Sequence, residues 1–404
     1  MASDVAPGRW SALAVLTATL VLGMSPWFSA SAVIPQLRAE WPLSGTAAAW
    51  LTIAVQVGFV AGALLSSLLN ISDVIAPRHV ILAGAVGAAL ANALLVAAGG
   101  AGPAILLRLA TGFCLAGVYP PAFKLMATWF QRGRGVALGT LAGAIAIASA
   151  VPHLVNGLGG LRWQTVVATT SVLTLLAGVL AEGAAREGPF PFPRAAFDPR
   201  QAGRVFANRG VRLASYGYFG HMWELFAMWA WFVVFLRDAL AGLGRAPDPA
   251  AAYGAFAVVA MGGPGSWLAG LLGDRWGRTR ITALAMALSG GCALGVGLLA
   301  TGPAWLLLLV GLVWGFTVVA DSAQFSTMVT ELADQAYVGT ALTLQFAVGF
   351  LLTVPTLWLV PLLQEAVGWR WTFASLAPGP ALGVAAMVRL RALPEAARIA
   401  GGRG

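Results

Sequence analysis

One apolar run of the sequence carries side chains that could exchange protons. The stretch SYGYFGHMWELFAMWAWFVVFL, residues 215–236, is long enough to cross a bilayer as a helix, and Glu224 is its only charged residue. Polar and aromatic side chains recur there at spacings of three and four, so they share one helix face: Tyr218, His221, Glu224, Met228 and Trp231. Burial disfavours a charged carboxylate and a nearby cation favours it. We hypothesise that Glu224, with His221 as its partner, titrates or binds a polar ligand group; the alternative is a structural pair that fixes its helix.

Charged and polar side chains interrupt other apolar runs as well. A charged residue at the centre of a membrane helix costs about 2.5–3.5 kcal/mol on insertion scales, so each is a candidate for function. Asp321 could couple to protons like Glu224, or act as a latch near the inner end. Arg108 could bind an anion, assist proton coupling or pair structurally. Further side chains expected to line a cavity are Trp27, Trp314, Gln324 and Gln345. For each tryptophan, ordinary packing or anchoring at the membrane interface is the alternative.

The composition places these residues in a membrane protein. Of 404 residues, 59% are hydrophobic and 10% are charged, whereas a soluble domain has about a quarter charged. The net charge of +9 would fit nucleic acid, but no basic patch with interleaved aromatic residues occurs, so we expect no such partner. Cys114 and Cys292 show no metal or disulfide spacing, and we expect neither a metal nor a cofactor.

Twelve apolar runs of helical length position the candidate residues: 10–31, 45–69, 79–99, 104–127, 135–156, 163–184, 211–236, 251–272, 280–300, 304–327, 338–361 and 369–390. The Pro- and Arg-rich segment 185–210 separates two sets of six. The sequence therefore predicts an all-α membrane protein with an N-terminal bundle at 1–184, a cytoplasmic linker at 185–210 and a C-terminal bundle at 211–404.

The distribution of arginine predicts the orientation. With the N-terminus inside, few arginines fall in outer loops: Arg38, Arg162, Arg237, Arg245 and Arg370. Basic residues accumulate on the cytoplasmic side of membrane proteins. We expect both termini in the cytoplasm and the protein in the cytoplasmic (inner) membrane of a bacterium.

The two halves repeat each other weakly. GLRWQT at 160–165 matches GWRWTF at 368–373, and RGVALG at 134–139 matches VGTALT at 338–343. Transporters built from duplicated units place their site near the bilayer midplane and move one half against the other.

The loop GLLGDRWGRTR, residues 270–280, resembles the signature Gly-x-x-x-Asp-Arg-x-Gly-Arg-x-Arg of the major facilitator superfamily. The matching residues are Gly270, Asp274, Arg275, Gly277, Arg278 and Arg280. The first-half copy, SLLNISDVIAPRH at 67–79, keeps Asp73 and Arg78 but lacks the glycines. RLATGFCLAG at 108–117 resembles the family's motif in the fourth helix. The resemblance implies two pseudo-symmetric six-helix bundles with helices 1, 4, 7 and 10 around a central cavity, so that Glu224, Asp321 and Arg108 face water. It assigns the loop motif to gating.

The leading functional hypothesis is a secondary transporter that moves a small solute by alternating access, as a proton-coupled symporter or antiporter. No Walker loop occurs. Arg108 and Lys124 on one helix favour an organic or anionic metabolite. Alternatives are a drug or metabolite efflux pump, and a copper-type importer using His221, Met222 and Met228. A membrane-embedded enzyme or receptor lacks the expected motifs. We expect a monomer surrounded by lipid, because two fused halves already enclose a pathway.

Overall fold

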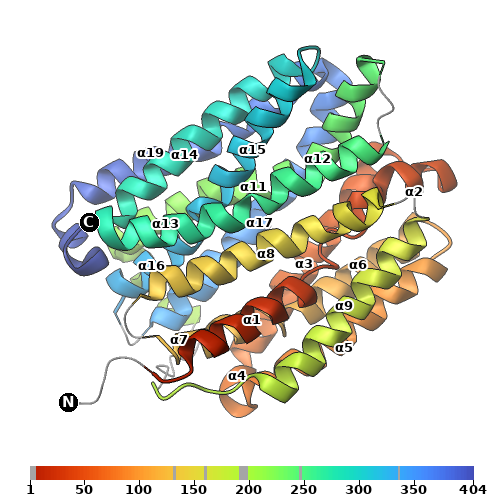
Figure 1. The fold of residues 1–404 in the computed structure, drawn as a ribbon. Coiled ribbons are helices and arrows are strands. Elements are labelled where there is room, and N and C mark those ends of the chain that lie inside the picture. The colour runs from red at the N-terminus through yellow and green to blue at the C-terminus, as the bar shows by residue number, and fades with distance from the viewer. Residues whose placement is uncertain (1–5, 131–132, 159–161, 191–198, 245–247, 335–336) are drawn as a thin grey trace.

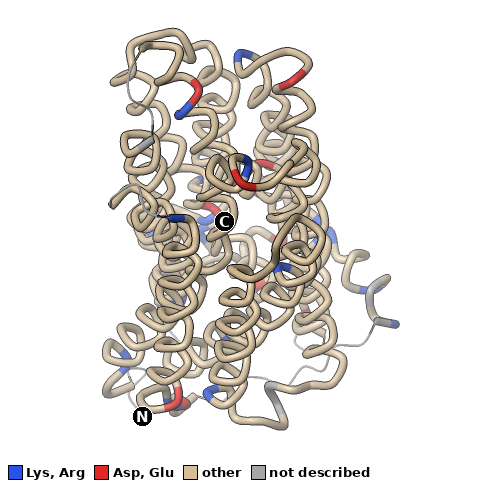
Figure 2. The backbone as a smooth tube through the Cα atoms, turned by 90° about the vertical axis from the view of Figure 1, so that its right-hand side faces the viewer, with Lys and Arg blue, Asp and Glu red and all other residues tan. Residues whose placement is uncertain are grey.

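The computed structural model describes residues 6–130, 133–158, 162–190, 199–244, 248–334 and 337–404. Within these ranges every regular element is a helix, and the long helices run side by side as an elongated bundle (Figure 1). Figure 2 shows long stretches of the chain without a charged residue, as expected for helices that face lipid.

The helices keep the predicted order. Those of residues 1–184, the first half, are α1 (Arg9–Gly23), α2 (Ile34–Glu40), α3 (Gly45–Leu68), α4 (Ile71–Val74), α5 (Pro77–Leu94), α6 (Ala101–Leu115), α7 (Tyr119–Ala127), α8 (Arg134–Gly157) and α9 (Trp163–Ala184). Those that follow are α10 (Ala202–Ala207), α11 (Arg209–Gly242), α12 (Asp248–Ala260), α13 (Gly262–Trp276), α14 (Arg278–Gly295), α15 (Ala304–Ala320), α16 (Ser322–Leu332), α17 (Val338–Val367), α18 (Trp369–Thr372) and α19 (Pro378–Arg391). We call residues 211–404 the second half; a division at these boundaries stays a prediction, and α10 lies within the expected linker.

Among the described residues, eleven helical segments are long and apolar enough to cross a membrane, and α1 is a shorter apolar helix. The prediction of a helix throughout 10–31 is wrong in its second half, because α1 ends at Gly23 and the chain then turns through buried residues 24–30. Pro26 lacks an amide hydrogen and disfavours helix at the residue before it, which accounts for the break. Irregular backbone at membrane depth must be satisfied by other protein groups.

The fourth and tenth spans are also interrupted. The fourth consists of α6 and α7, and Pro120 and Pro121 stand in the first turn of α7. The tenth consists of α15 and α16, which meet at Asp321. Discontinuous membrane helices are the usual places where transporters build their sites.

Among the described residues, the halves meet mainly along two seams. Along the first, α8 packs on α12 and α13, where glycines at every fourth position let the backbones approach. A Cβ atom added at Gly139 would lie 2.7 Å from the carbonyl oxygen of Ser266, and one at Gly143 would lie 2.7 Å from that of Gly263. Along the second seam α3 packs on α17, and the Phe59 and Phe350 rings lie 4.7 Å apart.

Candidate functional site

The carboxylate of Glu224 lies in the interior of the second half. Glu224 is 1% exposed and sits near the middle of α11. Its Oε1 accepts a hydrogen bond from Nε1 of Trp314 on α15 at 2.7 Å, and its Oε2 accepts one from Oγ of Ser289 on α14 at 2.9 Å. Both donors are neutral, so these contacts orient the carboxylate without balancing a negative charge.

His221 pairs with Asp321 rather than with Glu224. Its Nδ1 lies 2.8 Å from Oδ1 of Asp321, and both side chains are almost fully buried. The expectation that His221 is the partner of Glu224 is therefore wrong. Although the two residues share a helix face, Asp321 at the joint between α15 and α16 takes the imidazole contact.

Four residues at the end of the second half that the sequence predicts to be cytoplasmic form what we call the inner-end network: Asp274, Arg278, Gln324 and Glu331. Arg278 is 4% exposed, and its Nη2 lies 2.8 Å from Oδ1 of Asp274 and 3.1 Å from Oε1 of Glu331. Its Nη1 donates to Oε1 of Gln324 at 2.8 Å. Gln324 lies three residues after Asp321, so the short helix α16 begins directly after the histidine-paired acid and carries a ligand of Arg278 in its first turn.

The inner-end network reaches the first half through Asp274. A Cβ atom at Gly135 would lie 2.5–2.8 Å from the carboxylate atoms of Asp274, so only glycine leaves room for this side chain. Gly135 lies in the first turn of α8, where the helix dipole favours a negative charge. Gly270 faces the carbonyl of Gly135 just as closely. Asp274 thus lies against the opposite half.

The other signature residues have simpler surroundings. Gly277 has a φ of 100°, a left-handed value that other residues rarely adopt. Arg275 and Arg280 are exposed. In the first-half copy, Nε of Arg78 lies 3.8 Å from Glu182, and both side chains are more than a third exposed. The side chain of Asp73 lies outside the described residues.

Arg108 belongs to a separate cluster in the first half. It is fully buried on α6, and its Nη1 donates to the Pro26 carbonyl at 2.8 Å and to Asn92 Oδ1 at 3.0 Å. Further bonds reach Ser29, Leu51 and the Trp27 carbonyl. All its acceptors are neutral oxygens of the first half, and two of them, the carbonyls of Pro26 and Trp27, lie in the break after α1, where Pro26 also accepts the Ser29 amide. The guanidinium therefore completes the hydrogen bonding of that break.

The predicted aromatic residues meet between the halves or within the second half. Trp27 packs on Phe59 of its own half and on Phe226 and Phe350 of the other, with ring centroids 4.9, 5.8 and 5.7 Å away. Tyr218 lies 5.9 Å from the His221 ring. Trp231 donates to the Leu357 carbonyl at 3.1 Å, and Met228 is fully buried.

Several buried polar groups have no hydrogen-bond partner among the described residues. They include the indole nitrogens of Trp27 and Trp229, both side-chain polar atoms of Gln56 and Gln345, and Nε2 of His221. Buried polar groups normally have a partner, so such groups are candidates to contact water or a bound solute.

Three partners in these clusters escaped the sequence reasoning: Asn92, which binds Arg108, Ser289, which binds Glu224, and Glu331, which binds Arg278. Asn92 is an isolated amide in an apolar run and could have been found by the same rule as Gln345. Ser289 gives no comparable signal, because serine is common in membrane helices. Across the described residues, no group of three His, Cys, Asp or Glu side chains is placed to hold a metal ion.

Comparison with known proteins identifies the family of the chain and a solved structure with a similar fold. The family model of the Major Facilitator Superfamily matches residues 15–356, more than four fifths of the chain. None of the curated proteins compared with the chain matches it. A similar solved structure is that of a bacterial homolog of the human lysosomal transporter Spinster, in an inward-facing and unoccupied conformation. It covers 97% of this chain and 96% of its own with a TM-score of 0.68, and at 14% identity it shows the fold alone.

Proposed function

The chain belongs to the Major Facilitator Superfamily, and on this premise we propose that it moves a small solute by alternating access in exchange or together with protons. As a member of this family it is a multi-pass membrane protein and a secondary transporter rather than an enzyme. The observation that carries the proton coupling is the burial of Glu224 and of the His221–Asp321 pair inside the second half.

Proton binding fits the surroundings of these acids. A negative charge among apolar helices is costly, and uptake of a proton removes that cost. The two contacts of Glu224 are donations from neutral groups, and at least one of them survives when the acid is protonated. Glu224 can therefore change charge without leaving its place.

A structural path connects the acids to the contact between the halves. Asp321 sits at the α15–α16 joint, and Gln324 in the first turn of α16 binds Arg278. Arg278 in turn holds Asp274 against the first turn of α8. We propose that a change of charge at the His221–Asp321 pair shifts α16 and so loosens or tightens the inner-end network, which gates the cytoplasmic side.

The solute is proposed to be an organic or anionic metabolite that contacts the unpartnered groups of Trp27, Gln56, Trp229 and Gln345 near the seam between the halves. Binding of an anion by Arg108 would require its guanidinium to give up acceptors in the first half. The proposal includes a monomer in a bacterial cytoplasmic membrane with both termini inside, as the arginine distribution favours.

A transport assay tests the proposal once a solute is found by thermal-shift screening, since a ligand that binds the native state raises its apparent stability. Uptake into proteoliposomes is measured with and without an imposed pH gradient for the wild type, Glu224→Gln and Asp321→Asn. We expect the gradient to stimulate uptake in the wild type but not in Glu224→Gln or Asp321→Asn. Glu40→Gln, which changes an exposed acid at the end of α2, is the matched control. Equal stimulation in both variants of the buried acids would refute the coupling.

A further inference from the structure

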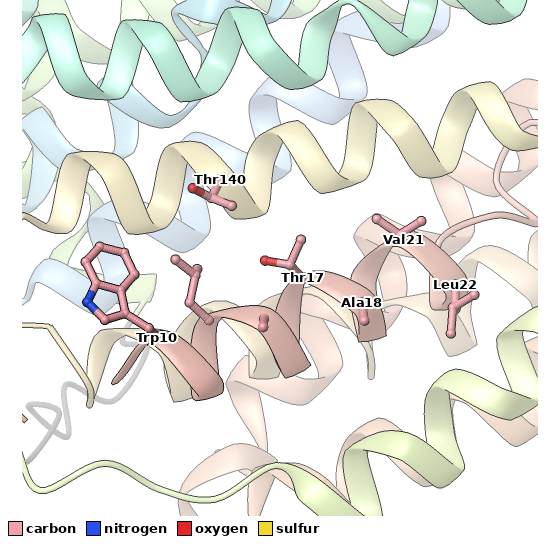
Figure 3. A pocket seen from close by; sticks show the side chains of 8 residues that line it. Trp10, Thr17, Ala18, Val21, Leu22 and Thr140 are labelled. Carbon is pink, nitrogen blue, oxygen red and sulfur yellow. The ribbon is translucent and has the colours of Figure 1, made fainter. Parts of the chain in front are cut away.

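A groove runs along the outer side of the first half between α1 and α8. It has a volume of about 590 Å³, and its lining includes Trp10, Thr17, Ala18 and Leu22 of α1 and Thr140 of α8 (Figure 3). The groove exists because the side chains of Ala14 and Ala18 in its lining are small. In Figure 1, α1 lies between α8 and α9 on the face turned to the viewer. The lining residues Trp10 and Ala14 are exposed, so the groove is open to the outside of the bundle.

The dimensions of the groove fit a hydrocarbon chain. Trp10 and Leu22 are twelve positions apart on one helix, a length of about 18 Å. This is slightly more than half of a hydrocarbon core about 30 Å thick, and therefore about one leaflet. Apart from the hydroxyl groups of Thr17 and Thr140, the lining is apolar, and a groove of this kind within a membrane is filled by an acyl chain rather than by water.

A cation lies at one end of the groove. The guanidinium carbon of Arg9 lies 5.0 Å from the ring centre of Trp10 and 5.4 Å from that of Phe130. The two rings meet edge to face at 5.7 Å and hold the guanidinium by cation–π contacts, which leave its N–H groups for other acceptors. Nε of Arg9 is buried and has no hydrogen-bond partner among the described residues, so an outside acceptor would bind the terminal nitrogens of this half-buried side chain. A phosphate group is a matching acceptor for arginine.

We propose that this groove binds one anionic phospholipid of the leaflet at the N-terminal end of α1. Its phosphate contacts Arg9, and one acyl chain lies along Ala14, Thr17 and Ala18. The chain bridges α1 and α8 at a place where the two helices leave a hollow. Asp274 of the inner-end network contacts α8 at Gly135, so the bound lipid would stabilise the helix that this network contacts.

Native mass spectrometry of the detergent-purified protein tests the proposal with two probes, phosphatidylglycerol and phosphatidylcholine of identical acyl chains. In the wild type we expect a first phosphatidylglycerol that is retained at higher collision energy than phosphatidylcholine. Arg9→Gln should weaken this first binding event about tenfold for phosphatidylglycerol, the change that goes with loss of a charge-assisted hydrogen bond. Arg391→Gln, at an exposed arginine on α19, should not.

Filling the groove gives a second, independent test. Ala18→Phe should remove the first lipid, whereas Ala168→Phe, at an exposed alanine on α9, should leave it bound. Gel filtration and circular dichroism establish that each variant is folded before binding is compared. Equal retention of the two lipids by the wild type, or an undiminished first lipid in folded Ala18→Phe, would overturn the proposal.

Discussion

The first, third and fourth spans of each half meet in a buried polar cluster, and the two clusters carry opposite charge. In the first half, Arg108 of the fourth span binds Asn92 of the third and carbonyls of the broken first. In the second half, Trp314 of the fourth span and Ser289 of the third both bind Glu224 of the first. The repeat thus preserves the meeting point of three helices, while the charged group has moved from the fourth span to the first.

This reversal separates two roles. Backbone carbonyls at the break cannot change their charge, and arginine stays protonated in proteins, so the first-half cluster is permanent. A carboxylate that accepts from neutral donors can exist with or without its proton, so the second-half cluster can change state. We infer that the first cluster holds the fold and that the second serves transport, and substitutions in the two should differ in kind.

The largest effect on stability is expected at Arg108. Arg108→Gln cannot reach all the acceptors in the first half and loses several hydrogen bonds from a charged donor, each contributing about 1.5–3 kcal/mol. We expect the free energy of unfolding to fall by at least about 3 kcal/mol. Heating in detergent followed by gel filtration of the surviving fraction measures the change, with exposed Arg162→Gln as control. A variant that melts with the wild type would break the comparison, because Arg108 would then not be structural.

A smaller loss of stability is expected at Arg278. Arg278→Gln removes the contacts to Asp274, Glu331 and Gln324, but the two acids are about a quarter exposed and can turn to water. We expect a loss of about 2 kcal/mol, below that of Arg108→Gln. The same variant should loosen the approach of Asp274 to α8, which distance measurements between spin labels on α8 and α13 would detect. An unchanged distance distribution would separate the inner-end network from gating.

Glu224→Gln should have little effect on stability. A glutamine keeps an oxygen that can accept from Trp314, and it removes a buried charge, so the melting behaviour should stay within about 1 kcal/mol of the wild type. Its effect should appear as lost response to a pH gradient. A strongly destabilised Glu224→Gln with normal coupling would reverse the assignment of roles to the two halves.

The sequence predicted the membrane spans and the buried charged residues better than it predicted which side chains these residues contact. Apolar run length identifies the spans because the bilayer fixes it, and the rule that polar groups in membranes are costly found Glu224, Asp321 and Arg108. Helix periodicity describes one helix at a time, so it predicted that His221 contacts Glu224. In the structure His221 contacts Asp321, because the packing of neighbouring helices decides the contact. The break after α1 was missed because the span was drawn by its length, although Pro26 marks the break in the sequence. Unless this break is known, nothing in the sequence shows that Arg108 donates hydrogen bonds to backbone carbonyl groups.

The smallest effect is expected at Arg78, the first-half counterpart of the signature arginine. Its Nε is 3.8 Å from Glu182, and both side chains are more than a third exposed, whereas Arg278 is buried with three partners. Exposed pairs of this kind contribute about 0–1 kcal/mol. Arg78→Gln should therefore melt within about 0.5 kcal/mol of the wild type, and its small effect should vanish at high salt, which screens exposed charges. Parallel melting of Arg78→Gln and Arg278→Gln at low and high salt measures the contrast. If the two variants lose equal stability, the first-half copy of the motif stabilises its half as much as the second-half copy does. The difference between the halves would then be confined to their buried clusters.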